Sequence, residues 1–219
     1  MKIDEIRHRL SRLDTACLCD ANKSIRTLDP GIRPIRSDLK LIGRARTVVC
    51  QDDFLTVILA LKEAEPGEVL VVDGRGGRRA LAGELFASEA ARKGLGGLVV
   101  DGAVRDIVTL HKLPVPVYSR YIFPNAGTTR RIFETQVPIT CGGVSVEPGD
   151  ILFGDEDGVI VASLEELAEG IPIAEEIQRK EEYVLAQLSQ GRSLLDMVNF
   201  DEHLASVAAQ RESKLEFTV

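Results

Sequence analysis

Two short, uninterrupted apolar runs constrain the fold of this chain more than any other feature. Residues 69–72 (Val-Leu-Val-Val) and 98–100 (Leu-Val-Val) contain no polar side chain, as is typical of strands buried on both faces of a parallel sheet. The alanine-rich segment 80–93 between them has helical composition, and the glycines of segment 94–97 end it. The sequence therefore predicts strand–helix–strand units, and with them an α/β domain.

The segments on either side extend this alternation. We expect helices at residues 3–13, 54–64 and 104–111, and a short helix at 16–22 that Asp14 or Thr15 caps. We expect strands at 41–50, with an early bulge at Gly43, and at 115–118. Short strands at 139–141, 144–146, 150–153 and 159–161, separated by glycine-containing turns, predict a β-rich second half.

The last part of the chain changes character. From Leu164 onward the pattern is helical and charged, with too few apolar positions for a core of its own. We therefore predict an α/β domain at residues 1–163 and a helical extension at 164–219. The extension is expected to pack on the core or on a neighbouring subunit.

Charge and cysteine content exclude some classes of function. A formal net charge of −7 over 219 residues disfavours nucleic acid as a partner. No apolar stretch is long enough to cross a bilayer, and the N-terminus lacks the apolar core of a signal peptide. We therefore expect a cytoplasmic protein with no membrane partner, and free thiols at its four cysteines.

Three charged residues form the strongest candidate site. Arg105 and Asp106 follow the buried run 98–100 at a predicted strand-to-helix corner, where open α/β sheets bind their ligands. Twenty residues separate Glu84 from Arg105, and Glu84 lies in the first turn of a predicted helix. Two carboxylates can hold a hard cation, and a guanidinium can bind a carboxylate or an enolate. The alternatives are an exposed Arg105–Asp106 ion pair and a Glu84 that only complements the helix dipole.

The helix start itself is a candidate anion site. The first N–H groups of a helix lack internal partners, so the amides of Leu85 and Phe86, which follow Gly83 and Glu84, can bind a substrate carboxylate. The glycine and lysine spacings of dinucleotide-binding and Walker motifs are absent. A basic loop precedes this helix, and it either contacts an anionic ligand or is simply solvated: Arg75, Arg78 and Arg79.

Several segments together resemble the RraA-like family, which includes the class II pyruvate aldolases that act on 4-hydroxy-4-methyl-2-oxoglutarate and 4-carboxy-4-hydroxy-2-oxoadipate. The resemblance runs from about Thr15 to Ala162 and rests on residues 15–16, 20–21, 43–48, 83–84, 100–106, 141–144, 148–150 and 157–159. It implies a layered β/β/α core of the phosphohistidine-domain type with a C-terminal helical extension.

The resemblance also implies roles for the candidate residues. Asp106 would ligate Mg²⁺ or Mn²⁺, Glu84 would hold the metal through a bound water, and Arg105 would contact the pyruvyl oxygen and stabilise the enolate. The amides of Leu85 and Phe86, next to Gly83, would bind the pyruvyl carboxylate. The family often has aspartate at the Glu84 position, so direct and water-mediated metal contact both stay open. The implied reaction releases pyruvate from a 4-hydroxy-2-oxo acid, with oxaloacetate decarboxylation as a side activity.

The same family contains non-enzymatic regulators that bind an endoribonuclease. Because this chain keeps the acidic–Arg–Asp set and the long C-terminal helices of the aldolases, we favour an enzyme with a small 2-oxo acid substrate. A lyase or hydratase acting on a sugar-acid-like substrate is a further alternative. Family members form homotrimers or hexamers with the cleft at a subunit interface, so a neighbouring subunit could supply a carboxylate from Glu175, Glu176, Glu181 or Glu182.

Overall fold

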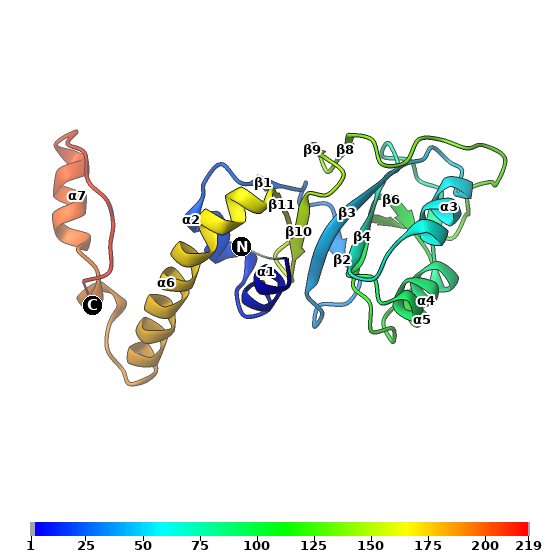
Figure 1. Cartoon of the computed structure of the whole chain (residues 1–219). Helices are drawn as coiled ribbons and strands as arrows, with labels where there is room; N and C mark the ends of the chain where they lie inside the picture. Colours follow the sequence, from blue (N-terminus) through cyan, green and yellow to red (C-terminus); the bar gives the residue numbers. More distant parts are fainter. Residues whose placement is uncertain (1–2, 219) are drawn as a thin grey trace.

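The computed structural model describes residues 3–218, and a nine-stranded mixed sheet forms its centre (Figure 1). Its middle strands run parallel in the order β3 (Leu41–Val49), β4 (Glu68–Asp73), β6 (Gly97–Val104) and β7 (Val117–Ile122). Antiparallel strands continue both edges: β10 (Ile151–Gly154), β11 (Val159–Ala162) and β1 (Arg26–Thr27) beyond β3, and β2 (Arg33–Pro34) beyond β7. The predicted α/β class is confirmed.

Different layers cover the two faces of the parallel strands. The helices α3 (Leu55–Glu63), α4 (Glu84–Lys93) and α5 (Ile107–Leu110) lie on one face, where Leu70 and Val72 are buried. The hairpin of β8 (Ile139–Cys141) and β9 (Val144–Val146) packs on the other, against Val69 and Val71. Alternate residues of one strand thus fill two cores, which is why run 69–72 is apolar throughout. The order of layers is β/β/α.

A third core lies at the antiparallel end of the sheet. There α1 (Ile3–Leu10), α2 (Thr15–Ala21) and the first turns of α6 (Leu164–Ser189) pack on β10 and β11. Asp14 is the cap of α2, with its carboxylate accepting from the Cys17 N–H at 2.8 Å, whereas Thr15 donates to Asp155 in the β10–β11 turn.

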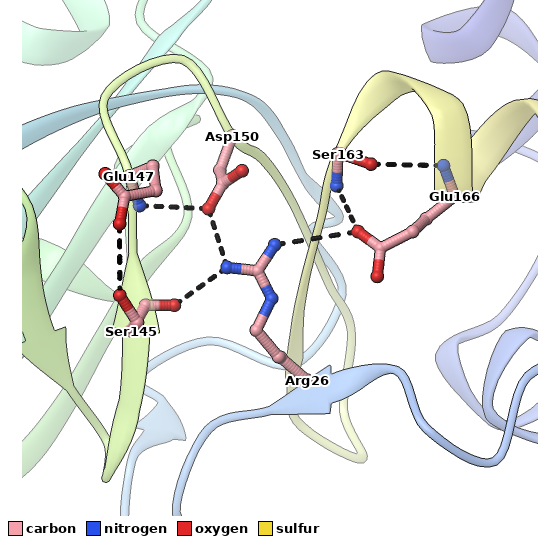
Figure 2. A network of polar contacts seen from close by, with 6 residues as sticks. All are labelled: Arg26, Ser145, Glu147, Asp150, Ser163 and Glu166. Carbon is pink, nitrogen blue, oxygen red and sulfur yellow. Dashed lines mark hydrogen bonds and ion pairs between the residues drawn. The ribbon is translucent and has the colours of Figure 1, made fainter.

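A polar network joins this end to the start of α6. Arg26 donates to the Ser145 carbonyl and to the Asp150 carboxylate, both at 2.9 Å, and lies 3.6 Å from the Glu166 carboxylate (Figure 2). Ser163 and Glu166 form a capping box, in which each side chain accepts from the backbone N–H of the other. The network therefore determines where α6 begins.

The C-terminal extension leaves the core as it proceeds. Leu167, Ile171 and Ala174 of α6 are buried, but no residue of α7 (Phe200–Ala208) is, and Figure 1 shows α7 projecting beyond the sheet. A 3-10 turn, η1 (Leu194–Met197), connects the two helices. The division at residue 163/164 stays a prediction, since the first turns of α6 belong to the third core. Within residues 3–218, no helix is both long and apolar enough to cross a membrane.

Two predicted boundaries are wrong near the candidate site. Residues 80–82 form a strand, β5 (Ala80–Ala82), rather than the first turn of a helix, because they pair in parallel with the end of β6. Tertiary pairing here overrides the helix propensity of alanine. Likewise, β6 continues to Val104 and α5 starts only at Ile107, so residues 104–106 are not helical.

The predicted bulge at Gly43 is also wrong. Strand β3 pairs with β10 in continuous register through this residue, and with β4 from Arg44 onward. A Cβ atom on Gly43 would lie 2.2 Å from the Gly67 carbonyl oxygen, so close approach of a neighbouring backbone explains the glycine.

Candidate active site

Strand β6 turns directly into α5 at Arg105 and Asp106. The Arg105 N–H donates to the Ala82 carbonyl at 3.1 Å, which ties the turn to β5. Asp106 has a left-handed backbone conformation (φ 63°, ψ 40°), which is uncommon for any residue other than glycine. Such conformations persist where the surroundings enforce them, and they concentrate at functional sites. The predicted strand-to-helix corner is therefore present and conformationally constrained.

The Asp106 carboxylate lies against the N-terminus of α4. Its Oδ2 atom accepts from the Glu84 N–H at 3.2 Å and lies 3.5 Å from Nε of Arg105. A Cβ atom on Gly83 would lie 2.4 Å from the same Oδ2, so the approach requires glycine at this position. The positive end of the helix dipole stabilises a carboxylate placed there. The structure thus brings the Gly83–Glu84 and Arg105–Asp106 segments together, as the sequence predicted.

Gly83, Arg105 and Asp106 line a cleft of about 100 Å³. The cleft is smaller than the roughly 300–1,000 Å³ typical of drug-sized ligands, and suits a small acid. Phe54 and Phe86 meet edge to face in its wall, with ring centroids 5.6 Å apart. Its lining includes the four predicted substrate-binding residues (Gly83, Leu85, Phe86 and Arg105) and the predicted metal ligand Asp106, but not Glu84. It also includes residues that the prediction lacked: Phe54, Ala80, Leu81, Ala82 and Ala126.

The side chain and the backbone N–H of Glu84 contact different residues. Its Oε2 atom accepts a hydrogen bond from the Thr109 hydroxyl of α5 at 2.6 Å. It is therefore the Glu84 backbone N–H, rather than its carboxylate, that contacts Asp106. A metal role for the Glu84 carboxylate stays a prediction.

The side chains around the cleft can be compared with the ligands that the predicted metal ion needs. No group of three or more His, Cys, Asp or Glu side chains in residues 3–218 is arranged to hold a metal ion. The contacts of the Asp106 carboxylate with the Glu84 N–H and with Arg105 both use Oδ2. Mg²⁺ is commonly held by one or two carboxylates, with water and substrate oxygens completing its octahedron. The Asp106 carboxylate fits such a partial ligand set but not a closed protein cage, and the Glu84 carboxylate is hydrogen-bonded to Thr109.

A second, larger cleft of about 500 Å³ opens at the carboxyl ends of β4, β6 and β7. Two of its charged groups are paired: Asp101 accepts from the Arg120 guanidinium, and also from the Gly142 N–H. Burial and the neighbouring Asp101 raise the pKa of Asp73. Arg75 lines this cleft, whereas Arg79 donates to the Ala126 carbonyl at 3.2 Å. The basic loop is therefore partly structural.

Sequence reasoning missed the part of the wall of the first cleft that Phe54 and Ala126 form. Ala126 belongs to the irregular segment 123–138, and Phe54 precedes α3. Asp53, next to Phe54, is 1% exposed and holds this segment in place. An acidic residue directly before a predicted helix is a capping signal, and that signal could have drawn attention to Asp53. Nothing local in the sequence indicates Ala126.

The chain also matches known proteins. The family model described as RraA-like, Aldolase/RraA, matches residues 15–161. The chain belongs to the RraA-like family. This match covers the sheet domain and both segments that form the cleft.

Individual relatives agree with the assignment. A protein of Halalkalibacterium halodurans, provisionally named a 4-hydroxy-4-methyl-2-oxoglutarate aldolase, is 40% identical over 151 residues, covering 68% of this chain and 72% of its own. The RNA-processing inhibitor RraA of Thermus thermophilis is 34% identical, covers 68% of this chain and 91% of its own, and superposes with a TM-score of 0.63. An uncharacterized protein of Pseudomonas syringae pv. tomato reaches a TM-score of 0.80 at 27% identity, covering 88% of this chain and 92% of its own.

Proposed function

We propose that this RraA-like protein is a divalent-metal-dependent lyase that cleaves a 4-hydroxy-2-oxo acid and releases pyruvate through an enolate. Decarboxylation of oxaloacetate, which leaves the same enolate, would be a side activity. The relatives named as aldolases support an aldolase-type reaction. The metal dependence is our own inference from the residues of the first cleft.

The observation that carries the proposal is the contact between Asp106 and the N-terminus of α4. Asp106 and Arg105 line the same small cleft as Leu85 and Phe86 of the first turn of α4, and this supports the proposal. A keto acid has a carboxylate and an adjacent carbonyl, which need an anion site and a cationic group a short distance apart. The cleft offers both.

Each residue has a distinct task in the proposed reaction. The amides of Leu85 and Phe86 bind the substrate carboxylate, because first-turn amides have no intrahelical partner. Arg105, whose side chain is 45% exposed, offers guanidinium donors to the oxygen on which negative charge develops. Phe54 and Phe86 exclude water from one side of the cleft.

Asp106 is the residue that would hold a Mg²⁺ or Mn²⁺ ion, and Glu84 would contact the ion through a bound water. When bound, the ion supplies Lewis-acid stabilisation of the developing enolate charge. The Asp106 carboxylate is oriented for this task by the Glu84 N–H and by Arg105. Among residues 3–218 no lysine lines the first cleft, and the proposed metal-assisted reaction does not use a Schiff base.

A coupled pyruvate assay tests the proposal. We expect pyruvate release from a panel of 4-hydroxy-2-oxo acids and from oxaloacetate, its loss with a chelator, and its recovery with added Mg²⁺ or Mn²⁺. Asp106→Asn should abolish this activity, while the matched variant Asp150→Asn, which lies in the network of Figure 2, should keep it. Turnover that survives the chelator or the Asp106 substitution would reject the mechanism.

The alternative is a non-enzymatic regulator that binds an endoribonuclease. The similarity to the Thermus thermophilis RNA-processing inhibitor favours it. Binding to an endoribonuclease in a pull-down, together with no activity on any oxo acid of the panel, would support this alternative.

The assembly and location are also part of the proposal. A homotrimer or hexamer would allow the helical extension, where α7 has no buried residue, to pack on a neighbour. Light scattering tests this, and a monomer at micromolar concentration would contradict it. Cell fractionation tests the proposed cytoplasmic location.

A further inference from the structure

Part of the wall of the first cleft belongs to a long irregular segment, residues 123–138. Ala126, which lines the cleft, lies in this segment. Its flanking residues are bonded to β5: the Ala80 N–H donates to the Asn125 carbonyl at 2.9 Å, and the Gly127 N–H donates to the Ala80 carbonyl at 3.0 Å. An exposed segment without regular structure needs further anchors to keep such a wall in place.

Asp53 supplies the main side-chain anchor. Its Oδ2 atom accepts from the Thr128 hydroxyl and the Arg130 N–H, both at 2.6 Å, and from the Arg131 N–H at 3.2 Å. Its Oδ1 atom accepts from the Leu55 N–H at 3.0 Å, at the start of α3. One carboxylate therefore joins the segment to a helix of the core.

Asp53 is also connected, through the chain, to Phe54 and Phe86, which line the cleft. Its neighbour Phe54 lines the cleft and packs edge to face on Phe86, the residue whose amide is proposed to bind the substrate carboxylate. A backbone hydrogen bond also joins Phe54 to segment 123–138, because the Phe54 N–H donates to the Thr128 carbonyl at 2.8 Å. A shift of the Asp53 carboxylate would be transmitted to both Phe54 and segment 123–138.

The charge state of Asp53 is consistent with this function. Asp53 is 1% exposed, and burial opposes its ionisation. The hydrogen bonds from Thr128, Arg130, Leu55 and Arg131 outweigh burial and hold the pKa of its carboxyl below the usual value. Asp53 is therefore a buried, ionised acceptor for four donors, and asparagine cannot replace it fully, because an amide NH₂ accepts nothing.

We propose that Asp53 is a positioning residue that holds segment 123–138 against the core and so sets the width of the first cleft, which Arg105 and Asp106 also line. The anchoring of the segment does not depend on the identity of the substrate. The consequence for oxo-acid affinity rests on the proposed function.

Asp53→Asn tests the proposal, with Asp150→Asn as a matched control. Asp150 is also a largely buried aspartate that accepts a backbone N–H and pairs with an arginine, but it lies in the network at the start of α6 (Figure 2). The first readout is the rate of tryptic cleavage after the exposed residues Arg130 and Arg131, measured by mass spectrometry well below the melting temperature. The second is KM and kcat for oxaloacetate with Mg²⁺.

We expect Asp53→Asn to raise the rate of cleavage at these two bonds about tenfold, because cleavage follows the population of the locally open state. KM should rise about tenfold with kcat within about twofold, since Arg105 and Asp106 are unchanged. Asp150→Asn should change neither readout. If Asp53→Asn does not fold, Thr128→Val removes one donor from the segment side and should change both readouts in the same direction.

Two results would overturn the proposal. Cleavage at the wild-type rate in a folded Asp53 or Thr128 variant would mean that the carboxylate does not hold the segment. Faster cleavage with an unchanged KM would mean that the segment does not set the cleft. If the wild-type protein turns over no oxo acid, the proposed function fails, and the cleavage rates still decide whether Asp53 is the anchor.

Discussion

Substituting Gly83 by alanine should damage the site far more than the fold. The new Cβ atom would lie 2.4 Å from Oδ2 of Asp106, about 1 Å closer than an ordinary van der Waals contact, and 3.2 Å from Cγ of Arg105. The Gly83 backbone is extended (φ −166°), so alanine adopts it without strain, and the Asp106 carboxylate must move instead. A misplacement of about 1 Å in a catalytic group can cost about 100-fold in rate.

We therefore expect Gly83→Ala to lower kcat/KM for pyruvate release about 100-fold. Overpacking should cost about 1–3 kcal/mol, so the variant should still fold. The coupled pyruvate assay measures the first quantity and thermal unfolding the second. Gly170→Ala is the matched control, since its Cβ would meet only Leu18 at 3.7 Å. Wild-type activity in a folded Gly83→Ala protein would refute the view that the contact between Asp106 and α4 organises the site.

Three further predictions follow from individual contacts. Arg105→Ala should lower kcat by about 10²–10³-fold in the same assay because an electrostatic donor is lost, and a change below about threefold would exclude the assigned role. Gly170→Ala should raise stability by about 0.5–1 kcal/mol, seen calorimetrically as a Tm increase of about 1–4 °C, since glycine inside α6 costs backbone entropy. The pKa of Asp53 is lowered on folding, so its contribution to stability is complete above the unfolded value of about 3.9 and is lost as pH falls through the folded value. The urea midpoints of wild type and Asp53→Asn should therefore converge below about pH 3.9, and a gap that is constant with pH would contradict the assignment.

The hydrophobic pattern predicted the centre of the fold, because a strand that is buried on both faces has an uninterrupted apolar sequence. Residues 69–72 and 98–100 are apolar at every position, and both lie in buried parallel strands. The same reasoning failed at residues 80–82, where alanine favours a helix but pairing with β6 stabilises a strand. Propensity describes one segment, whereas pairing depends on a partner about twenty residues away in the chain.

The candidate site was likewise predicted only in part from the sequence. The spacing of Glu84, Arg105 and Asp106, with the rule that ligands bind at carboxyl ends of strands, was enough to predict that these segments meet. It did not predict that the Glu84 carboxylate would accept from Thr109, because side-chain direction depends on the neighbouring helix. Nor did it predict that Ala126 lines the cleft, since hydrogen bonds to residues distant in the chain, such as Ala80 and Asp53, hold its segment there.

By itself, then, the sequence determined the α/β class, the family and the charged residues at the carboxyl edge, because periodicity and short motifs are properties of neighbouring residues. Only the tertiary structure decided which atoms of those residues face one another. Contacts such as that of Asp106 with the start of α4 depend on strand register and on a glycine at position 83, and they arise when distant segments pack together.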